Sequence, residues 1–185
     1  MESLRALDSY VPDDRIYNLK TVEQVYERAR SMIAAATEVV LFDLFPEPLR
    51  LLQMSLEQNA LRGIKVAGIG CGDIPKLRKV HIYTHPWNLV AETWPGQQIT
   101  IVADSRECLM AMVANDGESI RHAMWTDSVY FSCLQHSGLA SEIEVAFKKR
   151  ERGGPIAKLG LFTTPPPGLR TLTRQRRQHS ADAQK

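Results

Sequence analysis

Two histidines, His81 and His85, lie four positions apart, which is a spacing that could serve metal binding or catalysis. On a helix this spacing can bring two imidazoles to one ion. The segment around them instead predicts a strand followed by a loop, in which the two side chains do not converge. We therefore expect no metal site and no cofactor.

The three cysteines, Cys71, Cys108 and Cys133, are odd in number, widely separated and form no C-x-x-C pair. This arrangement argues against a disulfide framework and against a zinc knuckle. No cationic residue stands beside Cys71 to lower the pKa of its thiol. We expect three reduced thiols that are largely buried.

Polar and aromatic side chains follow three expected strands, and ligands of open parallel sheets bind beyond the carboxyl ends of the strands. These residues are Asp43, Phe45 and Glu47 at the first strand, Cys71, Gly72 and Asp73 at the second, and His85, Trp87 and Asn88 at the third. Their chemistry suits a small polar ligand, such as a sugar. The sequence therefore predicts a ligand site at this edge of the sheet.

Several of these candidates also have a structural interpretation. Asp43 stands alone in an apolar strand, and since a buried carboxylate needs a partner, it contacts either a ligand or a neighbouring polar group. Trp87 and Trp125 could stack on a ligand ring or serve as core or dimer anchors. Asp104 is expected to hydrogen-bond within its own turn, with ligand contact as the second possibility.

Hydrophobic periodicity predicts an α/β fold that positions these residues. Helices are predicted over 21–36, 48–61 and 88–93, and from Thr126 or Asp127 to about residue 149, with Thr21 and Gln24 spaced as a capping box. Strands are predicted over 38–45, 64–69, 79–83, 98–103, 108–114 and 122–125. The strand–helix–strand order over 38–69 requires a parallel pair, and the connection 104–107 predicts a hairpin.

The 185 residues suit one domain, predicted over 1–154, followed by a Pro-rich and then basic tail over 155–185 that we expect to be disordered. The net charge is +2, but residues 165–185 carry five basic residues against one acidic residue. The body is therefore slightly acidic and a poor match to DNA, which only the tail or a partner would contact. No membrane span or secretory signal is expected, so the prediction is a cytoplasmic protein.

The order of five segments resembles the effector-sensing domain of the TrmB-type transcription regulators. The match runs from residue 16 to about residue 149. It consists of Asn-Leu-Lys-Thr-Val-Glu-Gln-Val, Ala-Ala-Ala-Thr-Glu-Val-Val-Leu, Leu-Arg-Gly-Ile-Lys-Val, Val-Ala-Asp-Ser-Arg-Glu-Cys-Leu-Met and Ala-Met-Trp-Thr-Asp. The resemblance implies one half of a phospholipase D fold, with a mixed sheet and helices on both faces. The winged helix-turn-helix domain that precedes the sensor in this family is not expected in the roughly fifteen residues before the match.

The resemblance also implies a test for enzyme activity, because phospholipase D enzymes carry an H-x-K-x4-D motif. Asp104 takes the place of the aspartate, so Gln97 falls at the nucleophilic histidine and Ile99 at the phosphate-binding lysine. An amide is not a competent nucleophile for phosphoryl transfer, and isoleucine cannot neutralise phosphate charge. The resemblance implies the scaffold without its catalytic pair.

The sequence thus predicts a non-catalytic sensor domain that binds a small polar effector and forms a homodimer. The dimer is expected by analogy with the two facing halves of phospholipase D enzymes. Two alternatives remain open: a diverged phosphodiesterase that uses His81 or His85, and a ligand-free interaction module that modulates full-length regulators.

Overall fold

The computed structural model describes residues 15–72, 74–84 and 94–147. Several predicted features lie outside the described residues: Asp73, His85, Trp87, Asn88, the helix over 88–93 and the tail over 155–185. Within the described part, no helix is long and apolar enough to cross a bilayer.

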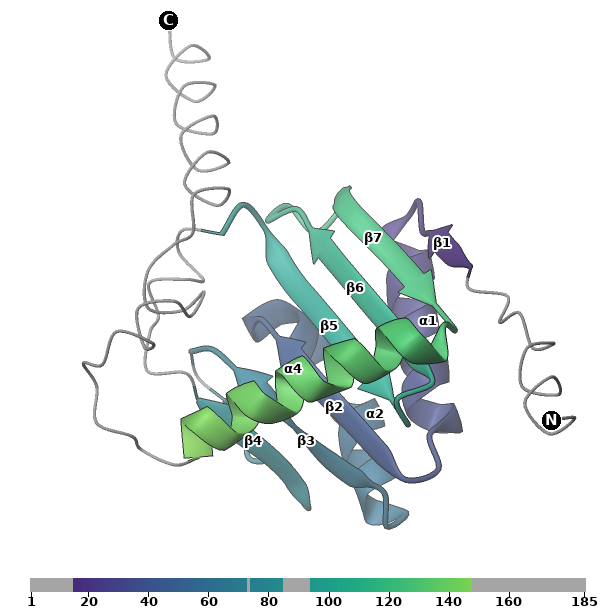
Figure 1. Cartoon of the computed structure of the whole chain (residues 1–185). Helices are drawn as coiled ribbons and strands as arrows, with labels where there is room; N and C mark the ends of the chain where they lie inside the picture. Colours follow the sequence, from purple (N-terminus) through teal and green to yellow (C-terminus); the bar gives the residue numbers. More distant parts are fainter. Residues whose placement is uncertain (1–14, 73, 85–93, 148–185) are drawn as a thin grey trace, which may run out of the picture.

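One seven-stranded mixed sheet forms the centre of the molecule (Figure 1). Its strands are β1 (Ile16–Asn18), β2 (Val39–Leu44), β3 (Lys65–Gly70), β4 (Val80–Thr84), β5 (Gln97–Ala103), β6 (Glu107–Val113) and β7 (Ile120–Thr126), in the order β1-β7-β6-β5-β2-β3-β4. Strands β2, β3 and β4 run parallel, whereas β5 is antiparallel to β2, and the remaining neighbours pair antiparallel. The predicted parallel unit and the predicted hairpin are both confirmed.

Helices cover both faces of this sheet, as predicted. Helices α1 (Val22–Ala35) and α2 (Pro46–Leu61) lie on one face, and α4 (Val129–Phe147) crosses the other (Figure 1). The larger core lies under α1 and α2 and includes Phe42, Ile101 and Leu109. The smaller core lies under α4 and consists of Leu41, Val102, Cys108 and Leu139. We call these the α1/α2 face and the α4 face.

Helix α1 begins where the capping box predicts. The Thr21 hydroxyl oxygen accepts a hydrogen bond from the Gln24 amide at 3.3 Å, and the Gln24 side chain accepts one from the Lys20 amide at 2.8 Å. These bonds satisfy amides that have no partner inside the helix. The apolar stripe of Val25, Ala29 and Ile33 is then fully buried against the sheet.

Helix α2 begins two residues before its predicted start because Pro46 takes the first helical turn, where its missing N–H costs nothing. Phe45 is therefore the N-cap and not part of strand β2. The crossover through α2 returns the chain to β3, which pairs in parallel with β2 from Val39 and Lys65 onward.

Three local predictions need correction. The N-cap of α4 is Ser128, whose hydroxyl accepts from the Phe131 amide at 3.3 Å, and not Thr126 or Asp127. Strand β1 was not predicted; it pairs antiparallel with the end of β7. Cys133 is exposed on α4 and not buried, whereas Cys71 and Cys108 are buried as expected.

Candidate functional site

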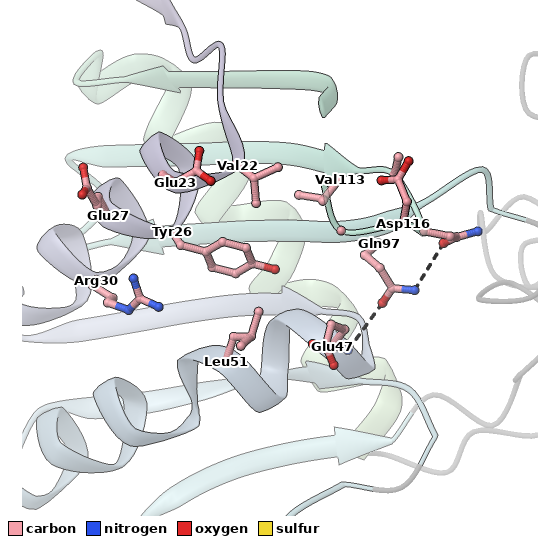
Figure 2. A pocket seen from close by; sticks show the side chains of 13 residues that line it. Val22, Glu23, Tyr26, Glu27, Arg30, Glu47, Leu51, Gln97, Val113 and Asp116 are labelled. Atoms are coloured by element: carbon pink, nitrogen blue, oxygen red, sulfur yellow. Dashed lines mark hydrogen bonds between the residues drawn. The ribbon is translucent and has the colours of Figure 1, made fainter. Parts of the chain in front are cut away.

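A pocket among the described residues opens beside the α1/α2 face and has a volume of about 640 Å³. Its lining comes from α1, the start of α2, the start of β5 and the end of β6 with the turn that follows (Figure 2). The lining residues are Val22, Glu23, Tyr26, Glu27, Arg30, Glu47, Leu51, Gln97, Val113, Ala114, Asn115, Asp116 and Gly117. The volume is in the range of small-molecule sites. We call it the α1–α2 pocket.

Gln97 lies between two walls of this pocket (Figure 2). Its side-chain oxygen accepts a hydrogen bond from the Glu47 backbone amide, and its side-chain nitrogen donates one to Asn115 Oδ1. Both hydrogen bonds are 3.4 Å long. Bonds of this length are weak, so the amide retains capacity for a ligand. Ile99, two residues further along β5, is fully buried in the core and cannot reach the pocket.

Carboxylates dominate the charge of the pocket. Glu23, Glu27, Glu47 and Asp116 line it, and Arg30 is the one cationic lining residue in the described part of the chain. Glu47 forms a salt bridge with Arg50, and its side-chain hydrogen bond to Arg50 lowers the pKa of Glu47. The pocket therefore presents a negative field around a partly apolar wall.

Tyr26 forms part of the pocket floor and is only 7% exposed. Its hydroxyl points into the pocket (Figure 2) and has no hydrogen-bond partner in the described residues. Burial, and secondarily the Glu47 carboxylate, raises the pKa of Tyr26 to about 12. The phenol stays protonated and is free to bond to a ligand.

Asp43, a predicted ligand residue, lies inside β2 on the α4 face and is 3% exposed. Its Oδ2 accepts a 2.5 Å hydrogen bond from Gln98 Nε2, whereas Oδ1 has no partner in the described structure. Burial, with a further contribution from the Glu142 carboxylate, raises the pKa of Asp43 to about 7. Asp43 is not among the pocket residues, and ligand contact by it remains a prediction.

Asp104 does not close its own turn as predicted. Its carboxylate accepts from the amides of Thr37, Glu38 and Val39 at 2.7–2.9 Å, and from the Thr37 hydroxyl at 2.9 Å. Partial burial works against ionisation, but these donors, led by the Val39 amide, outweigh it and hold the pKa of Asp104 below its usual range. Asp104, at a φ of 52°, thus ties the β5–β6 turn to the start of β2.

Trp125 lies on β7, next to the edge strand β1, and outside the pocket lining. Its indole nitrogen donates to Glu107 Oε2 at 2.9 Å, its ring centroid lies 4.8 Å from that of Tyr17, and the Arg28 guanidinium carbon lies 3.9 Å from the centroid. These contacts favour the core-anchor interpretation over ligand stacking. Phe45 is fully buried and is likewise not a lining residue.

The other candidates divide between described and undescribed residues. Cys71 is 2% exposed, and burial, with a smaller contribution from Asp43, raises the pKa of its thiol to about 11, which makes it unreactive. Asp73, His85 and Trp87 lie outside the described residues, so their role stays a prediction. Among the residues that the structure describes, no three His, Cys, Asp or Glu side chains gather to hold a metal ion.

Sequence reasoning found one pocket residue among the loop candidates, Glu47, and placed Gln97 only through the family resemblance. It missed Glu23, Tyr26 and Glu27. A signal was available, because Glu23 and Glu27 are four residues apart and flank Tyr26 on one side of a helix. That pattern is typical of an ordinary solvated helix surface, so it does not by itself indicate a site.

Comparison with known proteins gives relatives by structure only. No family model matches the chain, and no curated protein matches it. TrmBL2, an archaeal chromatin protein described as showing a novel mode of DNA binding, superposes with a TM-score of 0.52 at 12% identity. The match covers 77% of this chain and 57% of that of TrmBL2, so the chain spans little more than half of that relative.

NucT from Helicobacter pylori superposes with a TM-score of 0.58 at 15% identity, over 72% of this chain and 98% of its own. At such identities the likeness concerns the fold alone. The seven-stranded mixed sheet with helices on both faces agrees with it. The chain has a phospholipase D-like α/β fold, and the TrmB-like protein TrmBL2 has a similar fold.

Proposed function

We propose that this domain is a non-catalytic sensor of the TrmB regulator type, which binds a small polar, sugar-like effector in the α1–α2 pocket. The observation that carries the proposal is Gln97. It lines the pocket at the position that the resemblance assigns to the nucleophilic histidine, and its weakly bonded amide can bind a hydroxyl group.

The pocket chemistry favours binding over phosphoryl transfer. Gln97 supplies no nucleophile, and the position of the phosphate-binding lysine holds Ile99, which is fully buried. The alternative nucleophile His81 lies on β4, at the far edge of the sheet order from β6, and does not line the pocket. A panel of phosphodiester substrates is expected to show no turnover, and turnover that Gln97→Ala abolishes would contradict the proposal.

A thermal-shift screen over sugars, phosphosugars and nucleotides tests the proposal directly. A ligand present at about 100 times its dissociation constant adds roughly 2.7 kcal/mol to the free energy of unfolding and raises Tm. Gln97→Ala is expected to abolish the shift. The matched control Gln58→Ala, an exposed position of α2 outside the pocket, should leave it intact. A panel without any hit would overturn ligand sensing.

The proposed sensor is a homodimer that pairs through the outer surface of α4. Tyr130, Leu134, Ser137 and Ser141 are spaced by four, three and four residues, as in a coiled-coil seam, and all four are exposed. Tyr130 is 69% and Leu134 54% exposed. Tyr130 and Leu134, one helical turn apart, thus place two large apolar side chains next to each other on the outer surface of α4.

A second copy fits this stripe because its two halves are complementary. The first half carries bulky residues and the second half Ser137, Gly138 and Ser141, so that an antiparallel two-fold pair sets Leu134 against Gly138 of the other copy. A Cβ on Gly138 would meet no atom within 4 Å in the described structure, which leaves room for a close approach.

Light scattering across a concentration series tests the dimer. Leu134→Glu places two charges at the centre of the antiparallel pair and is expected to give a monomer. Met54→Glu, at a 69% exposed position of α2, is the matched control and should remain dimeric. A monomeric wild-type chain at every concentration would contradict the dimer and leave the ligand proposal intact.

A further inference from the structure

We infer that the α1–α2 pocket selects a ligand that carries a positively charged amine beside hydroxyl groups, and that it rejects phosphorylated ligands. The inference rests on the proposed function and deepens it by assigning the charge of the effector. It is carried by three features of the pocket: its carboxylates, the unpartnered Tyr26 hydroxyl and the shortage of cations.

The carboxylates differ in how far they are already engaged. Glu47 is bound to Arg50, and Asp116 accepts from the amides of Glu118 and Ser119 at 2.9 and 3.3 Å. Glu23 and Glu27, one helical turn apart on α1, have no ion pair within the described residues. These two side chains, which lie on the same side of the pocket (Figure 2), are the groups available to an incoming ammonium.

Two of the carboxylates, Glu23 and Asp116, are held ionised near neutral pH by nearby hydrogen-bond donors. The backbone amide of Glu23 and then the Thr21 hydroxyl lower the pKa of Glu23, and the Glu118 amide lowers that of Asp116. A phosphate group carries about −1.5 to −2 charges at pH 7. It would therefore meet several fixed negative charges, whereas an ammonium would be attracted by each of them.

The Tyr26 hydroxyl is a second feature of the pocket. Its side chain is more than nine-tenths buried, and the oxygen points into the cavity without a hydrogen-bond partner in the described structure. The oxygen is not among the described polar atoms that are fully closed off and unpartnered, so it is open to the pocket. Together with the amide of Gln97, this hydroxyl supplies neutral groups that suit the hydroxyls of a ligand.

Arg30 is the feature that could favour an anion. Its guanidinium carbon lies 5.8 Å from the centroid of the Tyr26 ring, at the end of the pocket away from Glu47 (Figure 2). Phosphate sites in proteins use several donors, such as paired arginines or a row of backbone amides. One arginine facing four carboxylates does not make such a site.

Titration calorimetry with three compounds on one ring tests the inference: glucosamine, glucose and glucose 6-phosphate. The full chain is used in low-salt buffer at a slightly acidic pH, where the amine is protonated. We expect glucosamine to bind at least about tenfold more tightly than glucose, which is about 1.4 kcal/mol. Glucose 6-phosphate should give no measurable heat, and added salt should weaken glucosamine binding but not glucose binding.

Glutamine variants of the pocket glutamates test whether the charge of these side chains, and not their shape, gives the preference for glucosamine. The double change Glu23→Gln and Glu27→Gln keeps the volume and is expected to remove the preference for glucosamine while glucose binding stays. Glu38→Gln, at an exposed glutamate outside the pocket lining, is the matched control and should keep the preference.

The outcomes distinguish this inference from the proposed function. Equal affinity for glucose and glucosamine, or tightest binding of glucose 6-phosphate, overturns the charge assignment and supports ligand sensing. Binding of the diamine putrescine, with none of the three sugars, supports the charge assignment and overturns the sugar-like effector. No binding of any of the four compounds overturns the charge assignment, and the broader thermal-shift screen then decides the proposed function.

Discussion

The two faces of the sheet use acidic side chains in opposite ways. On the α1/α2 face, carboxylates such as Glu23 and Asp116 line a pocket, and hydrogen bonds lower their pKa values. On the α4 face, Asp43 is buried under the helix, and burial raises its pKa to about 7. One face therefore offers fixed charge to a ligand, whereas the other encloses a carboxyl group whose ionisation is costly.

The faces also differ in how much apolar surface they bury. The core under α1 and α2 contains most of the fully buried side chains, whereas four buried residues form the core under α4. Helix α4 nevertheless carries exposed apolar residues on its outer side, among them Tyr130 and Leu134. The difference teaches that the α1/α2 face supplies most of the stability, while α4 is suited to contacts beyond its own sheet.

Paired truncations test this difference most directly. Ile101→Ala, in the larger core, is expected to lower the free energy of unfolding by about 4 kcal/mol, because the dense surroundings cannot collapse onto the cavity. Leu139→Ala, at the buried residue of α4 in the smaller core, is expected to cost about 2 kcal/mol, since a single helix can shift to fill the space. Urea unfolding measures both, and a larger loss at Leu139 would reverse the assignment of stability to the faces.

Local patterns explain why so much of the fold could be predicted. The apolar period of α1, its capping box, the β2–α2–β3 unit and the β5–β6 hairpin all depend on residues near one another in sequence. Strand β1 could not be found in this way. Its three residues show no alternation of burial, and they form a strand because they pair with β7, more than a hundred residues later.

The candidate site was less predictable because it depends on distant partners. The rule for strand ends selected Glu47, which lines the pocket, but Tyr26 becomes a pocket residue only when α1 packs beside α2 and β6. Asp104 shows the same limit: its partner Thr37 lies 67 positions away, so the sequence suggested only the amides of its own turn as donors to the carboxylate. Long-range pairing, and not local propensity, decides which polar residues meet.

Asp104→Asn tests the long-range clamp between the two halves of the sheet. Asparagine tolerates the positive φ but cannot accept all four hydrogen bonds, so we expect a loss of about 3 kcal/mol. Because the native pKa of Asp104 is lowered, its stabilisation is present above the unfolded value and is lost as pH falls through the native one. The variant should therefore lose less stability in acid than the wild type. Asp116→Asn, in an exposed turn, is the control and should cost much less than Asp104→Asn.

Asp43→Asn tests the other face, where the pH dependence has the opposite sign. The pKa of Asp43 is raised from 3.8 to about 7, so its contribution is complete below 3.8 and is lost as pH rises through about 7. The neutral variant should match the wild type near pH 4 and exceed its free energy of unfolding at pH 8, where the wild-type carboxyl group must ionise inside the core. Unfolding titrations at both pH values check this, and a wild-type advantage at pH 8 would show that the ionised form has a partner.

The smallest expected effect concerns the edge of the α1/α2 face, where Arg28 stacks on Trp125. Arg28→Met keeps most of the aliphatic stem but removes the cation lying 3.9 Å from the ring centroid, so we expect a loss of about 0.5–1 kcal/mol. Arg30→Met is the matched control, because its guanidinium carbon lies 5.8 Å from the Tyr26 ring and should contribute less. Urea midpoints measure both changes. A larger loss of unfolding free energy for Arg30→Met than for Arg28→Met would contradict this order. Trp125 would then be held by its hydrogen bond to Glu107 and its ring contact with Tyr17, and not by Arg28.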